Sequence, residues 1–233
     1  MFAVFVNTIG IILGSLAGCC FRCGISKEMN YVLMQALGLC AVVIGIQGAI
    51  KEDNILIMII SAVTGVFIGQ YADADGLVNK FTARIMSRFA KGEGDTAKLV
   101  NAFVTSCLIM NVGAMVIVGS LDAGLREDYT MLYTKSLLDT IAGVMMTAAM
   151  GIGVMGSAFF TLFFQGGIVL LAEQVAPYLS DYVIQEISCT GCLIILALGT
   201  NMLELTNIKV INYLPALVMV PLVIKLMNAI GLN

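Results

Sequence analysis

The sequence predicts an all-α membrane protein, a bundle of about eight transmembrane helices, on three observations. Apolar residues make up 60% of the chain and charged residues only 12%, which is about half the charge usual in soluble domains. The charges are clustered, leaving windows of about 18 residues or more nearly free of them. The apolar runs are continuous, whereas a transmembrane β-barrel would alternate apolar and polar residues. We therefore expect one integral membrane domain over residues 1–233.

Charged or turn-forming clusters divide the chain into segments close to the ~20 residues that span a bilayer. The first segment has no basic n-region, so we interpret it as a span and not as a cleaved signal peptide. The stretch 131–177 is too long for one span, and "GIGVMG" (151–156) divides it; without that division the count is seven. The eight predicted spans are Phe2–Phe21, Tyr31–Ile50, Asn54–Tyr71, Leu99–Ser120, Met131–Met150, Ser157–Val175, Val183–Leu203 and Ile208–Ile230.

A polar connector, residues 73–98, separates the third and fourth spans. Apolar residues recur there at four-residue spacing with basic residues between them, which is typical of an amphipathic helix on a membrane surface. A solvated connecting helix would give the same pattern, and both interpretations stay open. The apolar residues are Leu77, Phe81, Ile85 and Phe89, and the basic residues are Lys80, Arg84, Arg88 and Lys91.

The basic residues of the short loops predict that both termini face outward. Cytoplasmic loops carry an excess of Lys and Arg. With the N-terminus outside, three basic residues face out, Lys51, Arg126 and Lys225. Eight then face the cytoplasm: Arg22, Lys27, Lys80, Arg84, Arg88, Lys91, Lys98 and Lys209.

Internal similarity suggests an inverted repeat. The stretch "NYVLMQALGLCAVVIGIQGAI" (30–50) resembles "DYVIQEISCTGCLIILALGTNML" (181–203) with small gaps. Residues 1–72 would form repeat A and residues 154–233 repeat B, with central spans over 99–153. Two intervening spans give the copies opposite topologies, a frequent plan of secondary transporters with the substrate site near the midplane. Chance similarity of two apolar helices is the alternative.

Small residues four apart mark several spans as packing surfaces. In lipid, close backbone approach over such residues supplies van der Waals contact between helices. This interpretation predicts a compact bundle, and a stripe left facing outward would serve a homo-oligomer. The clearest stripes are Gly10, Gly14 and Gly18 in the first span and Gly65 and Gly69 in the third.

Lys135 and Asp139 are ionisable residues near the start of the fifth span. They lie four apart in "TKSLLDT" (134–140), so they share a helix face and can pair. An ionisable group inside a span costs a few kcal/mol, and a functional role is the default interpretation. A structural pair at the membrane edge, or a lysine that reaches the interface, stays open.

Two further groups of polar residues interrupt apolar spans. Asn201 and Glu204 end the seventh span in "LGTNMLE" (198–204), and Gln47 holds the corresponding place in the first copy. Paired interruptions of this kind point to a transport site. In the fourth span, "LIMNVGAMVIVGSLDAGL" (108–125) places polar residues and glycines where local unwinding is tolerated only around a protein-lined cavity. These central candidates are Asn111, Gly113, Gly119 and Asp122.

Several function classes are disfavoured by composition. The net charge of −3 argues against a nucleic-acid partner, and the absence of histidine removes the commonest metal ligand. Cys189 and Cys192 form a C-x-x-C, as do Cys20 and Cys23, but buried free cysteine usually behaves as a small hydrophobe. We expect no enzyme activity, no cofactor and no metal site.

The motifs resemble the YdfK/YqgA-type bacterial membrane proteins, a domain-of-unknown-function family. The carrying segments are "GIILGSLAG" (10–18), "VGAMVIVGSLDAGL" (112–125), "KSLLDT" (135–140), "GIGV" (151–154) and "LPA" (214–216). Ala114 and Thr140 depart from the Pro and Gly of the family pattern, so a kink there depends on Gly113. The resemblance implies a multi-pass protein of the bacterial cytoplasmic (inner) membrane, for which transport is often suggested.

The sequence therefore predicts a small secondary transporter or channel whose partners are the lipid bilayer and a small solute or ion. Asn111 and Asn201 could offer amide ligands, and Asp139 or Glu204 could carry a coupling proton or cation. Lys135 could balance Asp139 or meet an anionic group. A membrane structural or accessory protein, with polar groups that only hold helices together, is the alternative.

Overall fold

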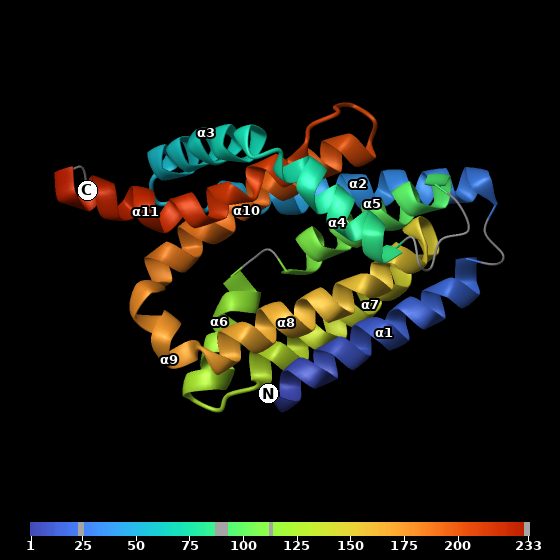
Figure 1. Ribbon diagram of the computed structural model, residues 1–233. Coiled ribbons are helices and arrows are strands. Elements are labelled where there is room, and N and C mark those ends of the chain that lie inside the picture. The colour runs from blue at the N-terminus through green and yellow to red at the C-terminus, as the bar shows by residue number, and fades with distance from the viewer. Residues whose placement is uncertain (23–25, 87–92, 112–113, 231–233) are drawn as a thin grey trace. The chain divides into compact units, whose positions relative to one another are not determined.

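The computed structural model describes residues 1–22, 26–86, 93–111 and 114–230, and within these ranges every regular element is a helix. The all-α prediction is confirmed over this part of the chain (Figure 1). The elements are α1 (Phe2–Arg22), α2 (Lys27–Ala49), α3 (Ile55–Tyr71), α4 (Ala74–Met86), α5 (Glu93–Asn111), α6 (Ala114–Leu125), α7 (Thr130–Met150), η1 (Ile152–Met155), α8 (Gly156–Leu170), α9 (Ala172–Val175), η2 (Ala176–Tyr178), α10 (Asp181–Met202), η3 (Val210–Tyr213) and α11 (Pro215–Ile230).

By length and apolar composition, five helical segments of the described chain can cross a membrane, or six if a bent pair counts as one crossing. The bent pair is α5 and α6, whose axes differ by 62°. Besides the shorter helices α4 and α9, two apolar helices fall outside this count. The apolar helix α3 has 17 residues, and α7 has 21 residues but contains Lys135 and Asp139. The predicted count of eight is therefore not confirmed by these criteria. The five clear segments are Phe2–Phe21, Tyr31–Ala49, Ile152–Leu170, Asp181–Met202 and Val210–Ala229.

The helix break predicted at "GIGVMG" (151–156) is confirmed. Helix α7 ends at Met150, and Gly151 has φ 96°, a backbone conformation in which a side chain would clash. The short turn η1 follows, and α8 begins at Gly156. Within the predicted connector, α4 ends at Met86 and α5 begins at Glu93. Phe89, Arg88 and Lys91 lie outside the described residues.

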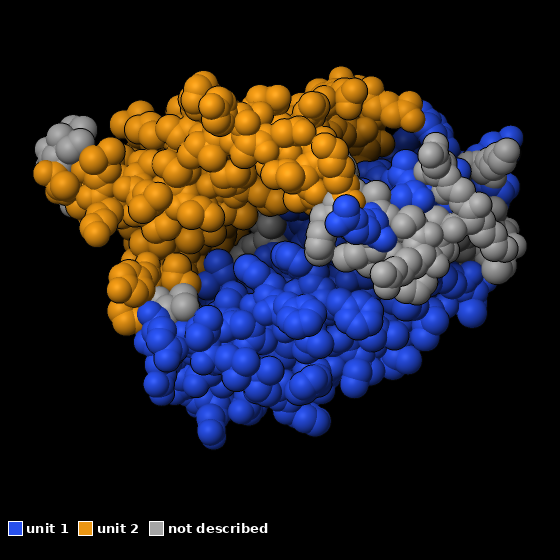
Figure 2. Space-filling view, viewed as in Figure 1, with its two compact units in different colours: residues 1–37, 81–176 blue, residues 38–80, 177–233 orange. Residues whose placement is uncertain are grey.

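The chain forms two compact units, coloured separately in Figure 2. Unit 1 comprises residues 1–37 and 81–176, and therefore holds α1, α5 to α9 and the start of α2. Unit 2 comprises residues 38–80 and 177–233, with the rest of α2, α3, α4 as far as Lys80, α10 and α11. Each unit thus combines segments from the beginning of the chain with segments from its later part.

In unit 1, α1 and α7 pack closely and run in the same direction (Figure 1). A Cβ on Gly14 would run into the carbonyl oxygen of Thr140, and one on Gly18 would lie 2.5 Å from the carbonyl oxygen of Val144. The glycine stripe of α1 therefore allows the two backbones to touch, as small residues do between membrane helices. Helix α8 also packs on α1 but runs in the opposite direction, because Gly166 of α8 lies near Val4 at the start of α1.

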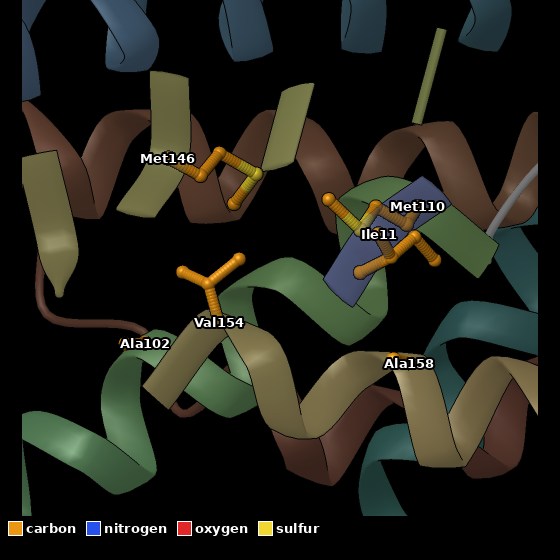
Figure 3. Close-up of a cluster of buried hydrophobic side chains, with 6 residues drawn as sticks. All are labelled: Ile11, Ala102, Met110, Met146, Val154 and Ala158. Atoms are coloured by element: carbon orange, nitrogen blue, oxygen red, sulfur yellow. The ribbon is translucent and has the colours of Figure 1, made fainter. Parts of the chain in front are cut away.

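Two apolar clusters build the core of unit 1. The first, shown in Figure 3, contains Ile11, Ala102, Met110, Met146, Val154 and Ala158. The second contains Ala3, Val4, Ala123, Leu132 and Val169. Along α1, α7 and α8 these two clusters are separated by about two to four turns of helix, and that interval holds polar residues described below.

In unit 2, two helix pairs pack antiparallel over small residues. Helix α2 lies on α10, where a Cβ on Gly45 would be 2.7 Å from the backbone of Leu196. Helix α3 lies on α11, where a Cβ on Gly65 would collide with the backbone of Ala216. Further along, Gly69 lies against the backbone of Asn212, whose side chain donates to Gln70 Oε1 at 2.9 Å.

Large apolar side chains cover outer faces of both units. Phe67 is 75% exposed in α3, and Phe163 is 76% exposed in α8 beside the stacked rings of Phe160 and Phe164. Water would penalise such surfaces, whereas lipid tails would not. This distribution, with apolar side chains outside and polar side chains inside, agrees with a helical membrane protein.

Candidate functional site

The polar interior of the described chain is concentrated in unit 1. Fourteen of the eighteen buried polar or charged side chains belong to it. Burying a polar group without a hydrogen bond is costly, and burying a charge costs more. An interior of this composition therefore has to be organised by specific contacts, and it is the first place to look for function.

Lys135 and Asp139 form an ion pair inside unit 1. The ammonium of Lys135 lies 2.8 Å from Asp139 Oδ1, and the two residues are only 6% and 4% exposed. The same ammonium donates to the carbonyl oxygen of Met110 at 2.6 Å. Met110 lies in the last turn of α5, where helix carbonyls lack an intrahelical partner. One lysine thus neutralises a buried carboxylate and satisfies the end of a neighbouring helix.

Asn7 and Gln165 extend this pair into a network across three helices. The amide nitrogen of Asn7 donates to Asp139 Oδ2 at 3.0 Å and to Gln165 Oε1 at 3.1 Å. Asn7 and Gln165 are both 0% exposed. Both carboxylate oxygens of Asp139 therefore accept a hydrogen bond, one from α7 itself and one from α1.

Asn111 lies where α5 ends, before α6 begins at Ala114. Its amide nitrogen donates to Cys107 O at 3.2 Å and to the hydroxyl of Thr161 in α8 at 2.9 Å. Nearby, the hydroxyl of Ser157 lies 3.4 Å from the sulfur of Met110. The end of α5 is therefore held from two sides, by Lys135 of α7 and by the polar face of α8.

Three amide atoms of this cluster have no hydrogen-bond partner among the described residues. They are Asn7 Oδ1, Gln165 Nε2 and Asn111 Oδ1, and each is buried. Most buried polar atoms in folded proteins are satisfied, so such atoms call for a specific explanation, for example an ion, water or solute bound in another state. We call Asn7, Asn111, Lys135, Asp139, Thr161 and Gln165 the polar cluster.

The polar cluster lies between the two apolar clusters of unit 1. Along α1, Val4 and Ile11 belong to different apolar clusters, with Asn7 between them. Along α7, Leu132 and Met146 flank Lys135 and Asp139 in the same way. Asp139 is close to the centre of α7, which runs from Thr130 to Met150. The cluster is thus a polar layer in the middle of a helix bundle.

The structure places the other sequence candidates of unit 1 at the margins of this layer. Gly119 is buried in α6, where a Cβ would lie 3.2 Å from Leu132. Asp122 pairs with Arg126 at 3.1 Å, and the side chain of Arg126 is 77% exposed. Gly113 lies outside the described residues.

The candidates of unit 2 lie on exposed or turn positions. Gln47 is exposed on α2. Asn201 organises the turn after α10, since its Oδ1 accepts from Ile208 N at 2.9 Å and its Nδ2 donates to Ile208 O at 2.7 Å. Glu204 is exposed in that turn with φ 59°. Among the described residues, none of these three side chains is hydrogen-bonded to another residue that the sequence predicted for the site.

The sequence analysis did not select Asn7, Thr161 and Gln165, although two signals were present. Asn7 is an amide within the first apolar span, and Ser157, Thr161 and Gln165 recur every fourth residue on one face of α8. A search for polar residues with helical spacing inside apolar spans would have found the second group. The pairing of Asn7 with Asp139, 132 positions away, follows only from the fold.

Among the described residues of unit 2, one carboxylate is fully buried, that of Glu186 in α10. Its Oε1 accepts from the backbone amides of Asp53 and Asn54 at 2.9 and 3.2 Å. Gln185 next to it donates to Lys51 O at 2.7 Å. Helix α10 therefore holds the turn that precedes α3.

Within the described ranges, no group of three or more Cys, Asp or Glu residues is arranged to hold a metal ion. Cys189 is buried and Cys192 partly buried in α10, and both are free thiols. Cys23 lies outside the described residues.

Helical composition, several membrane-length apolar helices and a buried ion pair define the class as a polytopic helical membrane protein. The chain belongs to the family described as "Protein of unknown function (DUF554)", which it matches over residues 2–225. It is 31% identical to the "Uncharacterized membrane protein YdfK" of Bacillus subtilis (strain 168), over the full length of both chains. It is 23% identical to the "Uncharacterized protein YqgA" of Escherichia coli (strain K12), over 92% of each chain. No solved structure matches. The resemblance carried by the sequence motifs is thus confirmed.

Proposed function

We propose that the protein is a small secondary transporter or channel of the bacterial inner membrane, without enzyme activity, and that the polar cluster forms its solute or ion pathway. One observation carries this proposal: a buried ion pair and three unpartnered amide atoms lie together in the middle of a helix bundle. Ionisable residues at such a depth are costly and usually functional. The exposed apolar faces leave room for a homo-oligomer.

The polar cluster adjoins a break between helices, as transport sites often do. Helices α5 and α6 differ in direction by 62°, and α5 ends with Asn111 and Met110, which contact α8 and α7. Discontinuous helices supply backbone groups to substrates near the midplane in many secondary transporters.

Helix directions support eight crossings with both termini on one side of the membrane, and the excess of Lys and Arg in the opposite loops favours that side being the outside. The parallel pair α1 and α7 requires an odd number of crossings between them, and α2 supplies one. The number stays odd only if α3 and the α5–α6 pair both cross the membrane or if neither of them crosses it. The first case gives eight crossings in total and the second gives six, so a total of seven is disfavoured. The 17 residues of α3 contain no Asp, Glu, Lys or Arg and extend for about 25 Å. This length is at the lower limit for a span, and we propose eight.

The antiparallel helix pairs also support an inverted repeat. Aligning Tyr31 with Tyr182 separates equivalent residues by 151 positions. Two observed contacts join residues with the same separation of 151 positions. They are Gly45 with Leu196 and Gly65 with Ala216. Helices related by a two-fold axis meet at equivalent residues. Helices α1 and α8, the remaining equivalent pair, also pack antiparallel in unit 1.

Within this proposal, Asp139 is the candidate coupling residue, because it is buried and its two carboxylate oxygens accept hydrogen bonds from side chains of α1 and α7. The exposed turn position of Glu204 makes it the weaker candidate. Lys135 balances Asp139 and can meet an anionic group when the pair separates. Asn7, Asn111 and Gln165 supply the amide groups for a solute, whereas Asn201 shapes a turn.

Uptake into liposomes tests the proposal. The full-length protein is reconstituted, and radiolabelled ions, amino acids, nucleobases and carboxylates are offered with and without a pH or sodium gradient. We expect at least one class to accumulate, and Asp139→Asn to abolish its coupled uptake. Asp122→Asn, on an exposed pair, is the matched control and should retain it. Unaltered uptake in the Asp139→Asn protein would exclude the coupling role.

A structural or accessory role is the second candidate, because Lys135 and both oxygens of Asp139 already have protein partners. This role predicts that variants of the polar cluster lose stability in detergent while no solute passes through wild-type liposomes. The Lys135→Gln/Asp139→Asn double variant separates the two roles. It keeps neutral, hydrogen-bonding side chains, so a purely structural cluster should survive and a transport site should not.

A further inference from the structure

We propose that the polar cluster binds a small zwitterion, a molecule with one carboxylate and one ammonium group and a short side chain, as in the smallest free amino acids. The inference rests on the proposed function and names the substrate class of the same site. Three properties of the cluster lead to it: its net charge, its remaining hydrogen-bonding atoms and the packing around it.

The net charge of the ion pair disfavours simple ions. Lys135 Nζ and Asp139 Oδ1 are 2.8 Å apart, so a metal cation that approaches the carboxylate also meets the ammonium. An inorganic anion at the ammonium meets the carboxylate in the same way. In a medium of low dielectric constant such repulsion is strong. A ligand with no net charge leaves the site neutral before and after binding.

The remaining hydrogen-bonding atoms are of both kinds. Asn7 Oδ1 and Asn111 Oδ1 are unpartnered acceptors, and Gln165 Nε2 is an unpartnered donor. An ammonium group carries three donors and needs acceptors, whereas a carboxylate needs donors. The ligand ammonium therefore suits Asp139 and the two asparagine oxygens, and the ligand carboxylate suits Lys135 and the glutamine nitrogen.

A zwitterion can replace both ion-pair partners when Lys135 and Asp139 separate, which a neutral polyol or amide cannot do. When the internal pair separates, each of its charges needs a new opposite charge, because an uncompensated buried charge is strongly destabilising. A zwitterion supplies both charges in one molecule, and one buried ion pair becomes two. Hydrogen bonds to charged groups are about twice as strong as neutral ones, so an uncharged ligand cannot replace the lost pair.

The packing limits the ligand to a small one. Asn7, Thr161 and Gln165 are all 0% exposed, and the hydrogen bonds that link Asn7 to its partners are 3.0 and 3.1 Å. The two apolar clusters of unit 1 close the layer on either side along the helices. A ligand that enters by separating one ion pair gains room for little more than its two charged groups.

Thermal stabilisation of the purified full-length protein in detergent provides the test, read by circular dichroism because the chain has no tryptophan. Phosphate buffer replaces zwitterionic buffers. The probes are glycine and alanine, with glycinamide lacking the carboxylate, propionate lacking the ammonium, and sodium chloride as controls. We expect the zwitterions to raise the melting temperature with an apparent affinity at least about tenfold higher than either single-charge analogue, since one charge-assisted contact is worth roughly that factor.

Two variants place the effect at the polar cluster. The Lys135→Gln/Asp139→Asn double variant keeps hydrogen-bonding side chains, and we expect it to remain folded but to lose at least about tenfold in zwitterion affinity. Gln47→Ala, on an exposed face of α2, should respond like wild type. Equal responses to zwitterions and single-charge analogues, an undiminished zwitterion affinity in the double variant, or no response of the wild type to any zwitterion would each overturn the substrate class.

Liposome uptake keeps this inference distinct from the proposed function. Zwitterions that stabilise the protein without being transported would contradict the transporter proposal and leave the binding class standing. The opposite outcome is that the protein transports an inorganic ion or a polyol and that this transport depends on Asp139. It would support the transporter proposal and overturn the zwitterion class.

Discussion

The ammonium of Lys135 donates a 2.6 Å hydrogen bond to the backbone carbonyl of Met110, which joins the middle of α7 to the last turn of α5. The C-terminal end of a helix carries partial negative charge, and a cation nearby stabilises it. The same ammonium neutralises Asp139 at 2.8 Å. Any event that separates this ion pair therefore also changes the support of α5 next to its junction with α6.

Neutralising one member of the ion pair is expected to destabilise the protein more than neutralising both. Lys135→Met leaves Asp139 as an uncompensated buried charge, and we expect a loss of about 3–5 kcal/mol in the free energy of unfolding. The Lys135→Met/Asp139→Leu double variant removes both charges and should recover most of this loss. Unfolding titrations in mixed detergent micelles measure the difference.

The exposed ion pair of Asp122 and Arg126 provides the control for this measurement. The side chain of Arg126 is 77% exposed, and such pairs contribute about 0–1 kcal/mol. Arg126→Gln should therefore change the unfolding free energy by less than about 1 kcal/mol. A double variant of the buried pair that is as unstable as the single variant would show that the two charges do not act as a pair.

Adding one methyl group on the glycine stripe of α1 is expected to separate α1 from α7. A Cβ on Gly14 would collide with the backbone of Thr140, and backbone atoms cannot move aside as a flexible side chain can. We expect Gly14→Ala to cost about 1–3 kcal/mol, the usual range for overpacking. The loss should appear as a lower melting temperature of the protein in detergent.

Gly167 of α8 is the matched control, because no atom of the described residues, beyond its chain neighbours and the adjoining backbone of α8, lies within 4 Å of the position that its Cβ would occupy. Alanine has a higher helix propensity than glycine by about 1 kcal/mol, so Gly167→Ala should be neutral or slightly stabilising. If Gly14→Ala and Gly167→Ala changed the melting temperature alike, the result would contradict the close packing of α1 against α7 at Gly14.

Patterns along the chain predicted the helical membrane class, the break at Gly151 and the ion pair of Lys135 with Asp139. These features depend on local composition or on residues four apart, which one helix brings together. The partners of that pair could not be predicted in the same way. Asn7 reaches Asp139 across 132 positions, and an amide within an apolar span does not indicate which helix it will meet. Gln47 and Glu204 were likewise predicted as transport-site residues from their places in the sequence, which do not show whether a side chain is buried. The structure places both on exposed positions.

Replacing Glu186 tests how α10 holds the turn before α3. Its Oε1 accepts two backbone hydrogen bonds, from Asp53 and Asn54. Glu186→Leu leaves both amides unsatisfied and should cost about 1–3 kcal/mol for each amide that remains buried. Glu186→Gln keeps an acceptor oxygen and should retain most of the wild-type stability. Hydrogen exchange of the 50–56 backbone gives a local readout, with faster exchange expected only for the leucine variant.

Labelling of single cysteines tests the eight-crossing topology with outward termini. After replacement of the seven native cysteines, Asp53→Cys and Arg126→Cys should react with a membrane-impermeant maleimide in intact cells. Lys80→Cys and Thr206→Cys should react only after the membrane is opened. All four positions are exposed, so a lack of reaction reports the side of the membrane and not burial. Lys80 separates eight crossings from six, because it faces outward if α3 and the α5–α6 pair do not cross. Reaction of the Lys80→Cys protein in intact cells, with Thr206→Cys still protected, would exclude the eight-crossing topology, and a reversal at all four positions would place the termini inside.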